Sequence, residues 1–73
     1  MSLIKNTLDK IDLSVLTAGT TVQSRVTYGM GEIVSVDHDE ATLNIKWQDS
    51  GETITAPHAK LQKVMLVQRG PMH

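Results

Sequence analysis

The sequence predicts a mainly β protein, a small barrel of five short strands preceded by a short helical segment. Three observations predict this fold class. Apolar residues recur at every second position over much of the chain from residue 20 onward, which is the period of a half-buried strand. Glycines and short polar clusters separate these runs, as in tight hairpins. With 73 residues the chain has room for one domain. We expect a helical segment over residues 1–18, a barrel over residues 19–67 and a flexible tail over residues 68–73.

The N-terminal segment carries the spacing of an amphipathic helix. Ile4, Leu8 and Ile11 stand at positions i, i+4 and i+7, which share one helical face. A helix this short is marginal in water. We therefore expect its apolar stripe to lie on the barrel or on another chain.

A second short helical turn is expected over Leu13–Ala18. Asp12 or Ser14 can cap its start, because a carboxylate or hydroxyl oxygen accepts a hydrogen bond from a free backbone N–H group there. Gly19 would close the turn in the left-handed conformation, which glycine adopts without strain.

Five strands are predicted from the alternation of side chains and from β-branched residues. In chain order they span Thr20–Val26, Glu32–Val36, Thr42–Trp47, Glu52–Ala56 and Leu61–Val67. The third run alternates most cleanly, with Leu43, Ile45 and Trp47 on one face. We therefore expect Trp47 to finish the core, and an exposed indole is the alternative.

The connections between the strands carry turn residues. Their ranges are Tyr28–Gly31, Asp37–Glu40, Gln48–Gly51 and, as a 3₁₀ turn, Pro57–Lys60. Gly51 is expected in the left-handed conformation of a hairpin loop. The last strand is apolar on both sides, because residues 64–67 are all apolar. Either the N-terminal helix or a second chain should cover its outer side.

Four segments of the barrel region also carry a family pattern. They are Gly19–Val22, Tyr28–Val36, Leu43–Trp47 and Ala59–Leu61. In this valine strand, glycine-rich connection, alternating third strand and final leucine turn, the chain resembles the small Tudor-like and KOW-like barrels attached to bacterial helicases and transcription factors. The resemblance covers about residues 19–67. It implies a five-stranded SH3-like barrel that binds a protein surface or nucleic acid through strand faces and loops.

Tudor domains that read methylated lysine or arginine surround the cation with several aromatic side chains. This chain has one tyrosine, one tryptophan and no phenylalanine, so we do not expect such a cage. Tyr28 lies in a turn, where its ring either covers the end of the barrel or offers a stacking surface.

Six residues form the candidate partner-binding set. They are Arg25, Tyr28, Met30, Lys46, Trp47 and Lys60. With both rings exposed beside the three cations, they would form a small platform for single-stranded nucleic acid. The formal net charge of -1 leaves few cations for phosphates, although the residues after Glu52 include basic and no acidic side chains. We therefore predict docking on a protein partner, with nucleic-acid binding as the alternative.

We expect no enzyme, and we predict no catalytic, cofactor-binding or metal-binding residues. The chain has no cysteine, so a thiolate nucleophile and a cysteine zinc site are excluded. Gly29 and Gly31 lack a third glycine and lead into a strand, so they offer no helix N-terminus to a phosphate. Asp37–Glu40 lacks the spacing of a calcium loop and is predicted to be a solvated hairpin tip.

A second resemblance is to the short SH3-like chains of plasmid-borne type II dihydrofolate reductases. It would place a pore-lining strand at Glu52–Pro57. Those enzymes use a glutamine and a tyrosine in that strand, where this chain has Thr53 and Ala56. Reductase activity is therefore not our prediction.

The first residues lack the apolar run of a secretory signal, and no stretch of about 20 apolar residues occurs. We expect a cytoplasmic protein with no membrane partner, either a monomer or a homodimer. A small accessory factor of a mobile element or phage fits this description.

Overall fold

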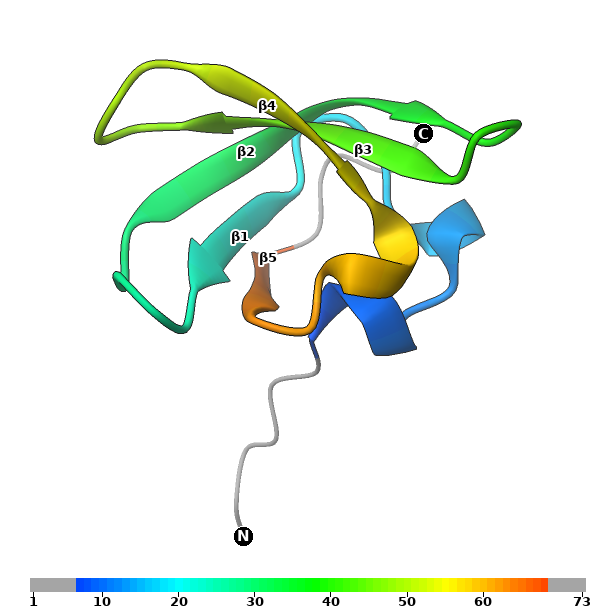
Figure 1. Ribbon diagram of the computed structural model, residues 1–73, viewed down its shortest axis with the longest axis horizontal. Helices are drawn as coiled ribbons and strands as arrows, with labels where there is room; N and C mark the ends of the chain where they lie inside the picture. The colour runs from blue at the N-terminus through cyan, green and yellow to red at the C-terminus, as the bar shows by residue number, and fades with distance from the viewer. Residues whose placement is uncertain (1–6, 69–73) are drawn as a thin grey trace, which may run out of the picture.

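The structure of the chain is a computed structural model that describes residues 7–68. Five strands form one antiparallel sheet (Figure 1), namely β1 (Thr21–Ser24), β2 (Met30–Asp37), β3 (Thr42–Trp47), β4 (Thr53–Pro57) and β5 (Val64–Gln68). The strand order is β4-β3-β2-β1-β5, so the last strand returns to pair with the first. The prediction of a mainly β fold with five strands is confirmed.

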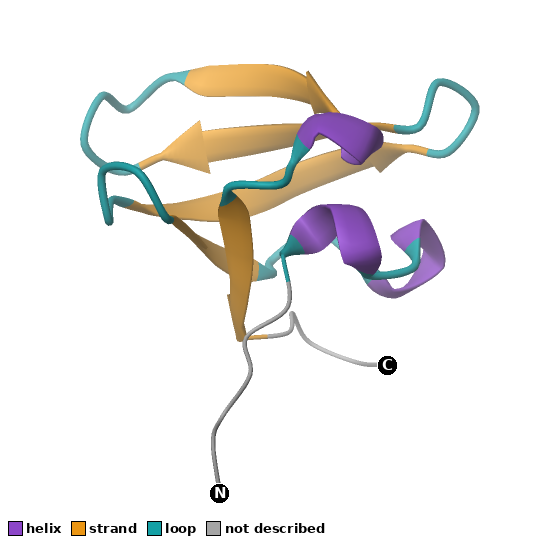
Figure 2. Cartoon of the chain, turned by 60° about the horizontal axis from the view of Figure 1, so that its bottom comes forward, coloured by secondary structure: helices purple, strands orange, loops and turns teal. Residues whose placement is uncertain are grey.

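The sheet curls into a half-barrel and does not lie flat (Figure 1). Two irregularities help to bend it, because a residue without a partner kinks its strand and increases the local twist. One lies between Thr21 and Val22 in β1, and the other lies between Ile33 and Ser35 in β2. As a result β5 stands across the direction of β2, β3 and β4 (Figure 2). The inner faces of the strands therefore enclose one core.

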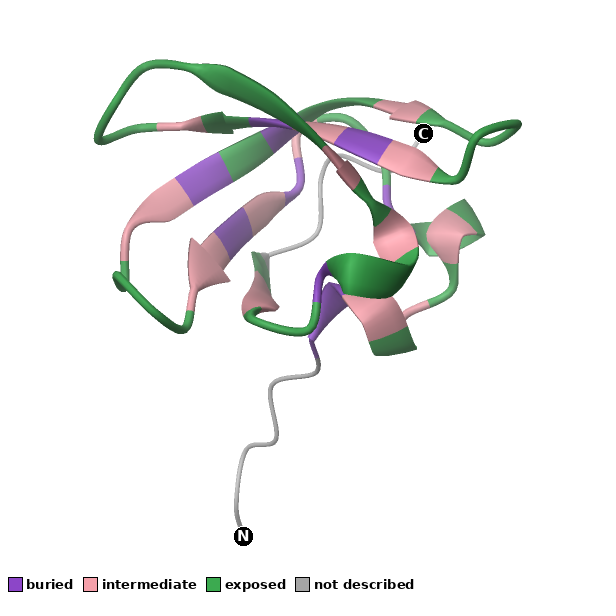
Figure 3. Cartoon of the chain, viewed as in Figure 1, coloured by how far each residue is buried: buried purple, intermediate pink, exposed green. Residues whose placement is uncertain are grey.

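The buried core is a small set of apolar side chains from the sheet and from the segments that flank it. They are Leu8, Leu16, Val22, Ile33, Leu43, Ile45 and Leu61. Buried and exposed residues alternate along β2 and β3 (Figure 3). Leu43 and Ile45 are buried and Trp47 packs against the same cluster, so the expectation that Trp47 finishes the core is confirmed. Its indole is half-buried at the end of β3.

The N-terminal segment differs from the predicted helix. Within residues 7–18 the helical structure consists of two short 3₁₀ turns, η1 (Leu8–Lys10) and η2 (Leu13–Val15). Thr7 is paired with Met65 in an isolated antiparallel bridge. The backbone there lies against the outer edge of β5, and that pairing together with a buried leucine outweighs the weak tendency of so short a segment to form an α-helix. Ile4, the first residue of the predicted stripe, lies outside the described residues.

Leu8 of this segment is buried in the core together with side chains of the sheet, so the described part of the segment packs on the barrel. Within residues 7–68 no helix is long and apolar enough to cross a membrane.

A histidine ties the N-terminal segment to the far side of the barrel. After β4 the chain forms the predicted 3₁₀ turn, η3 (His58–Lys60). The Nε2 atom of His58 lies 2.7 Å from the backbone oxygens of both Leu8 and Ile11. Carbonyl oxygens only accept hydrogen bonds, so Nε2 carries the hydrogen and donates it to both. These two bonds hold the N-terminal segment across the gap between β4 and β5.

The predicted cap and the two turn glycines are confirmed. The Asp12 carboxylate accepts a hydrogen bond from the backbone N–H of Ser14 at 3.1 Å and caps η2. Gly19 and Gly51 have φ angles of 93° and 72°, which is the left-handed conformation predicted for both.

The ends of four strands differ from the prediction. β2 begins two residues before and ends one residue after the predicted run, and β4 begins and ends one residue later than predicted. β1 stops at Ser24, whose hydroxyl accepts a hydrogen bond from the backbone N–H of Val26 and turns the chain. The last strand begins at Val64, and Leu61 enters the core from the turn before it. The predicted tail overlaps β5, because Gln68 ends that strand, and residues 69–73 lie outside the described part.

We expect His58→Ala to lower the free energy of unfolding by about 1–3 kcal/mol, because the Ile11 carbonyl group loses its donor and the Leu8 carbonyl group keeps only the N–H of Ile11. Urea denaturation measures the loss. His38→Ala is the matched control, since that ring is exposed and has no hydrogen-bond partner among the described residues. Its effect should stay within about 0.5 kcal/mol. Equal losses in the two variants would contradict the role of His58.

The Asp12 cap predicts a pH dependence of stability. Hydrogen bonding to Ser14, first from its backbone N–H and then from its hydroxyl, lowers the pKa of Asp12 below the ordinary value of 3.8. A carboxyl group whose pKa is lower in the folded state stabilises the fold above its unfolded pKa, and this contribution is lost as the pH falls through the folded pKa.

We therefore expect the difference in unfolding free energy between the wild type and Asp12→Asn to shrink as the pH is lowered through and below 3.8. Urea titrations at a series of pH values measure this difference, and a carboxyl-carbon NMR titration locates the pKa. A difference that does not change with pH, or an Asp12 that titrates above 3.8, would refute the cap's contribution.

Candidate functional site

Two loops meet at one end of the sheet. The β1–β2 loop spans residues 25–29 and the β3–β4 loop spans residues 48–52, both on the left in Figure 1. A Cβ atom placed on Gly29 would lie 2.6 Å from a carboxylate oxygen of Asp49. The Asp49 side chain therefore lies directly against the Gly29 backbone, and the two loops are in contact.

Short polar side chains hold the β1–β2 loop in shape. The Ser24 hydroxyl accepts hydrogen bonds from the backbone N–H groups of Val26 and Thr27 at 3.1 and 3.2 Å. The Thr27 hydroxyl accepts one from the Gly29 N–H at 3.1 Å. Serine and threonine commonly make such local bonds in turns. The loop is therefore organised without burial of Val26, which is 63% exposed.

Tyr28 has an unusual backbone conformation. Its φ angle is 63°, in the left-handed region that costs a residue other than glycine roughly 1–2 kcal/mol. The Gln23 side-chain amide donates to the Tyr28 carbonyl oxygen at 3.1 Å and helps to hold it there. The ring is not buried in compensation, because Tyr28 is 70% exposed. Of the two arrangements expected for this ring, the exposed one is found.

The indole of Trp47 lies between the loops and the core. Trp47 pairs with Gly31 of β2. A Cβ atom on Gly31 would lie 2.8 Å from Cε3 of Trp47 and 3.1 Å from Cγ2 of Ile45. The ring therefore packs on bare backbone, a contact that any side chain at position 31 would obstruct. Packing against the core fixes the orientation of the indole.

An open pocket of about 310 Å³ lies between these elements. It is lined by Ser24, Thr27, Trp47, Asp49, Ser50 and Ile54. Trp47 and Ile54 form its apolar part, and Ile54 is 50% exposed. The Asp49 carboxylate has no hydrogen-bond or ion-pair partner among the described residues. An apolar wall beside a free carboxylate suits a group with an apolar stem and a positive end, such as a lysine or arginine side chain.

Four of the six predicted site residues lie at or beside this end of the sheet. Arg25 and Tyr28 belong to the β1–β2 loop and are exposed, Met30 begins β2 and is half-buried, and Trp47 ends β3. The backbone N–H of Arg25 donates to the carbonyl oxygen of Lys63 at 2.7 Å, which joins this loop to the start of β5.

The other two predicted residues lie elsewhere. Lys46 precedes Trp47 in β3 and so points to the opposite face of the sheet, where it lines a separate pocket with Glu32 and Val34. Lys60 lies in η3, beyond the end of β4 that pairs with the start of β3. The three cations are therefore not brought together around the two rings.

Sequence reasoning missed Val26, Asp49 and Ile54. The prediction places Val26 at the end of the first strand and Ile54 within the fourth strand, and the alternation does not show that the fourth strand lies at the edge of the sheet. A β-branched residue beside a turn tyrosine was the available signal for Val26. Asp49 had no signal, because its contact with Gly29 joins two loops that are far apart in the sequence.

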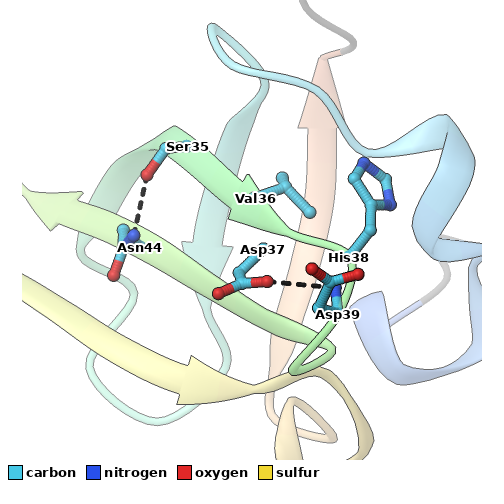
Figure 4. A pocket seen from close by; sticks show the side chains of 6 residues that line it. All are labelled: Ser35, Val36, Asp37, His38, Asp39 and Asn44. Atoms are coloured by element: carbon cyan, nitrogen blue, oxygen red, sulfur yellow. Dashed lines mark hydrogen bonds between the residues drawn. The ribbon is translucent and has the colours of Figure 1, made fainter.

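A second pocket lies at the opposite end of β2 and β3 (Figure 4). It is lined by Ser35, Val36, Asp37, His38, Asp39 and Asn44. The Asp37 carboxylate accepts hydrogen bonds from the backbone N–H groups of Asp39 and Glu40 at 3.0 and 3.1 Å, and the His38 ring points away from it (Figure 4). Within residues 7–68 no three histidine, aspartate or glutamate side chains converge as metal ligands.

No protein-family model, no curated protein and no solved structure matches this chain. The function is therefore inferred from the chemistry of the site.

We expect Gly31→Ala to lower the free energy of unfolding by about 1–3 kcal/mol, because the added methyl group would press on the rigid Trp47 ring and on Ile45. Gly29→Ala is the matched control, since its methyl group would meet the movable end of the Asp49 side chain and, at 3.2 Å, the Thr27 hydroxyl, and no packed ring. Urea denaturation with tryptophan fluorescence measures both. A loss in Gly29→Ala as large as that in Gly31→Ala would contradict the packing described for Trp47.

Proposed function

We propose that this chain is a non-catalytic binding module that docks on a protein partner through one end of its barrel. The surface concerned, called here the loop-end surface, consists of Val26, Tyr28, Trp47, Asp49 and Ile54. The observation that carries the proposal is Tyr28, an exposed ring held in a strained backbone conformation, in the loop that borders the Trp47 pocket through Thr27.

The backbone of Tyr28 closes the β1–β2 turn, since its N–H group donates to the Ser24 carbonyl oxygen at 3.0 Å. The turn does not require an aromatic ring at this position, and the ring gains no burial from the fold. A residue that costs stability and stays exposed is typical of a binding site. Tyrosine and tryptophan are enriched in protein interfaces, where a few large side chains supply most of the affinity. The local hydrogen bonds of the β1–β2 loop reduce the entropy lost when a partner binds.

The pocket suggests the chemistry of the partner. A lysine or arginine side chain would lay its stem on Trp47 and Ile54 and bring its charge to Asp49. The Trp47 ring adds a cation–π attraction where the charge passes over its face. We therefore propose a partner segment in which a basic residue is flanked by apolar ones.

Two observations favour a protein over nucleic acid as the partner. Within residues 25–29 and 48–52 the single cation is Arg25, and nucleic-acid affinity comes mainly from cations that neutralise phosphates. The free carboxylate of Asp49 would repel a phosphate backbone. Nucleic-acid binding through Arg25 and the exposed Tyr28 ring is the alternative.

We also propose that the barrel is SH3-like, of the Tudor-like or KOW-like type. Support comes from a meander of strands whose last member pairs with the first, and from the 3₁₀ turn just before that strand. In such a barrel the loops at one end form a natural docking platform, which agrees with the position of the loop-end surface.

The test uses a phage-displayed library of random linear peptides selected on the immobilised chain. We expect selected peptides to carry a basic residue next to apolar ones and to shift the amide signals of residues 25–29 and 47–54. Tyr28→Asn should weaken peptide binding by about tenfold or more. It should not destabilise the fold, because asparagine enters the left-handed region more readily than tyrosine.

Two further variants sharpen this test. Asp49→Asn should weaken binding of the basic peptides and reduce its dependence on salt, whereas Val34→Thr, an exposed change on the other face of β2, should leave binding unchanged. The proposal fails if Tyr28→Asn binds the peptides as well as the wild type. It also fails if a pool of short oligonucleotides shifts the same amide signals while the peptides do not.

A further inference from the structure

The outer edge of β4 carries unpaired backbone groups. Two hydrogen bonds at the ends of the β3–β4 ladder show which residues face β3. The Trp47 N–H donates to the Glu52 oxygen at 3.0 Å, and the His58 N–H donates to the Ala41 oxygen at 2.8 Å. Hydrogen-bonded residues alternate along an antiparallel ladder, so Ile54 and Ala56 also face β3. The N–H and C=O groups of Thr53 and Thr55, and the C=O group of Pro57, therefore face away from the sheet.

These groups meet no other part of the described chain. Within residues 7–68, no backbone hydrogen bond joins these groups of Thr53, Thr55 and Pro57 to an element outside the sheet. In Figure 2, β4 is the uppermost strand and no described segment lies above it. The strand has no charged residue to protect its edge from pairing, and Pro57, a residue type that also protects edges, stands only at its last position.

The opposite edge of the sheet is in a different state. Thr7 pairs with Met65 and so occupies the outer edge of β5. This segment obstructs head-to-tail pairing of β4 with the middle of β5 in another copy. The free edge that remains can pair with another copy by meeting the same edge, and such an isologous contact closes at two copies.

We propose that β4 pairs with β4 of a second copy of this chain, antiparallel and centred on Thr55. In this register the two Thr55 residues lie opposite each other and exchange two hydrogen bonds. Each Thr53 N–H donates to the carbonyl oxygen of the partner's Pro57. Every outward N–H group of the two edges then has an acceptor, and Pro57 needs none because it has no N–H.

The side chains near this axis are complementary as well. Ile54, which is 50% exposed, lies opposite the partner's Ala56 on the inner face of the joined sheets. Glu52 lies opposite the partner's His58, in the same turn as the partner's Lys60. Each copy thus brings an acidic residue to a basic turn, and the contact occurs twice by symmetry.

The strength of this contact follows from its size. A strand of five residues buries less than the roughly 1,200–2,000 Å² of a stable protein interface. We therefore expect a reversible dimer that dissociates on dilution.

Sedimentation of the full chain over a range of concentrations is the first test. The average mass of the wild type should rise toward that of a dimer. Thr55→Pro removes the outward N–H group and should weaken association by roughly tenfold or more, while the fold persists because proline is tolerated at such edge positions. Thr55→Ala is the matched control, since it loses the same hydroxyl bond to Asn44 but keeps the N–H group. It should associate like the wild type.

Disulfide trapping tests the register. The chain has no cysteine, so one introduced thiol reports on one position. Residues opposite each other in a bonded pair have Cα atoms about 5.5 Å apart, within the disulfide range of about 4.4–6.8 Å. Thr55→Cys should therefore cross-link at least about tenfold faster than Thr53→Cys, an equally exposed control that lies opposite the partner's Pro57.

Three results would overturn the proposal. They are a wild type that stays monomeric at every concentration, an association that survives Thr55→Pro, and equal cross-linking of the two cysteine variants. The first would leave the edge to a strand of another protein, and the second would place the contact on another surface. Ile54 belongs to both surfaces, whereas Tyr28 and Asp49 lie outside the β4 strand, so their variants test the loop-end surface separately.

Discussion

Closure of the curled sheet by the N-terminal segment is the constraint on which the rest of the structure depends. Five short strands leave a gap between β4 and β5, and the sheet alone has few side chains to bury. Leu8 and Leu16 supply two of the most completely buried residues, with 0% and 1% exposure. His58 holds this segment in place through the carbonyl groups of Leu8 and Ile11. Since a small domain has little core to lose, these contacts carry a large share of the stability.

A closed barrel can hold features that cost stability at its end. The strained Tyr28 lies in the loop at that end, beyond the last residues of β1. Such features persist only when the surrounding structure determines them. The free edge of β4 is likewise a part of the molecule that core formation does not use. The two proposed contact surfaces are therefore the regions in which the sequence serves something other than the fold.

The sheet could be predicted from the sequence because alternation and turn chemistry are local signals. Leu43, Ile45 and Gly51 show this, since each takes the place that its neighbours in sequence indicate. The predicted N-terminal helix is found only as two 3₁₀ turns in residues 7–18, because the edge of β5 offers Thr7 a partner that the helical spacing does not show. The site was predicted in part. Tyr28 and Trp47 lie at it, whereas the contact of Asp49 with Gly29 depends on the tertiary fold.

Native-state hydrogen exchange at the N-terminal segment tests the central claim most directly. The Asp9 N–H donates to the Leu61 carbonyl oxygen, and the Ile33 N–H in the middle of the sheet donates to that of Thr20. If the segment is an integral part of the core, both amides exchange through the same global unfolding, and their opening free energies converge as denaturant is added. Exchange of Asp9 through a local opening that denaturant hardly affects, while Ile33 stays protected, would contradict this account.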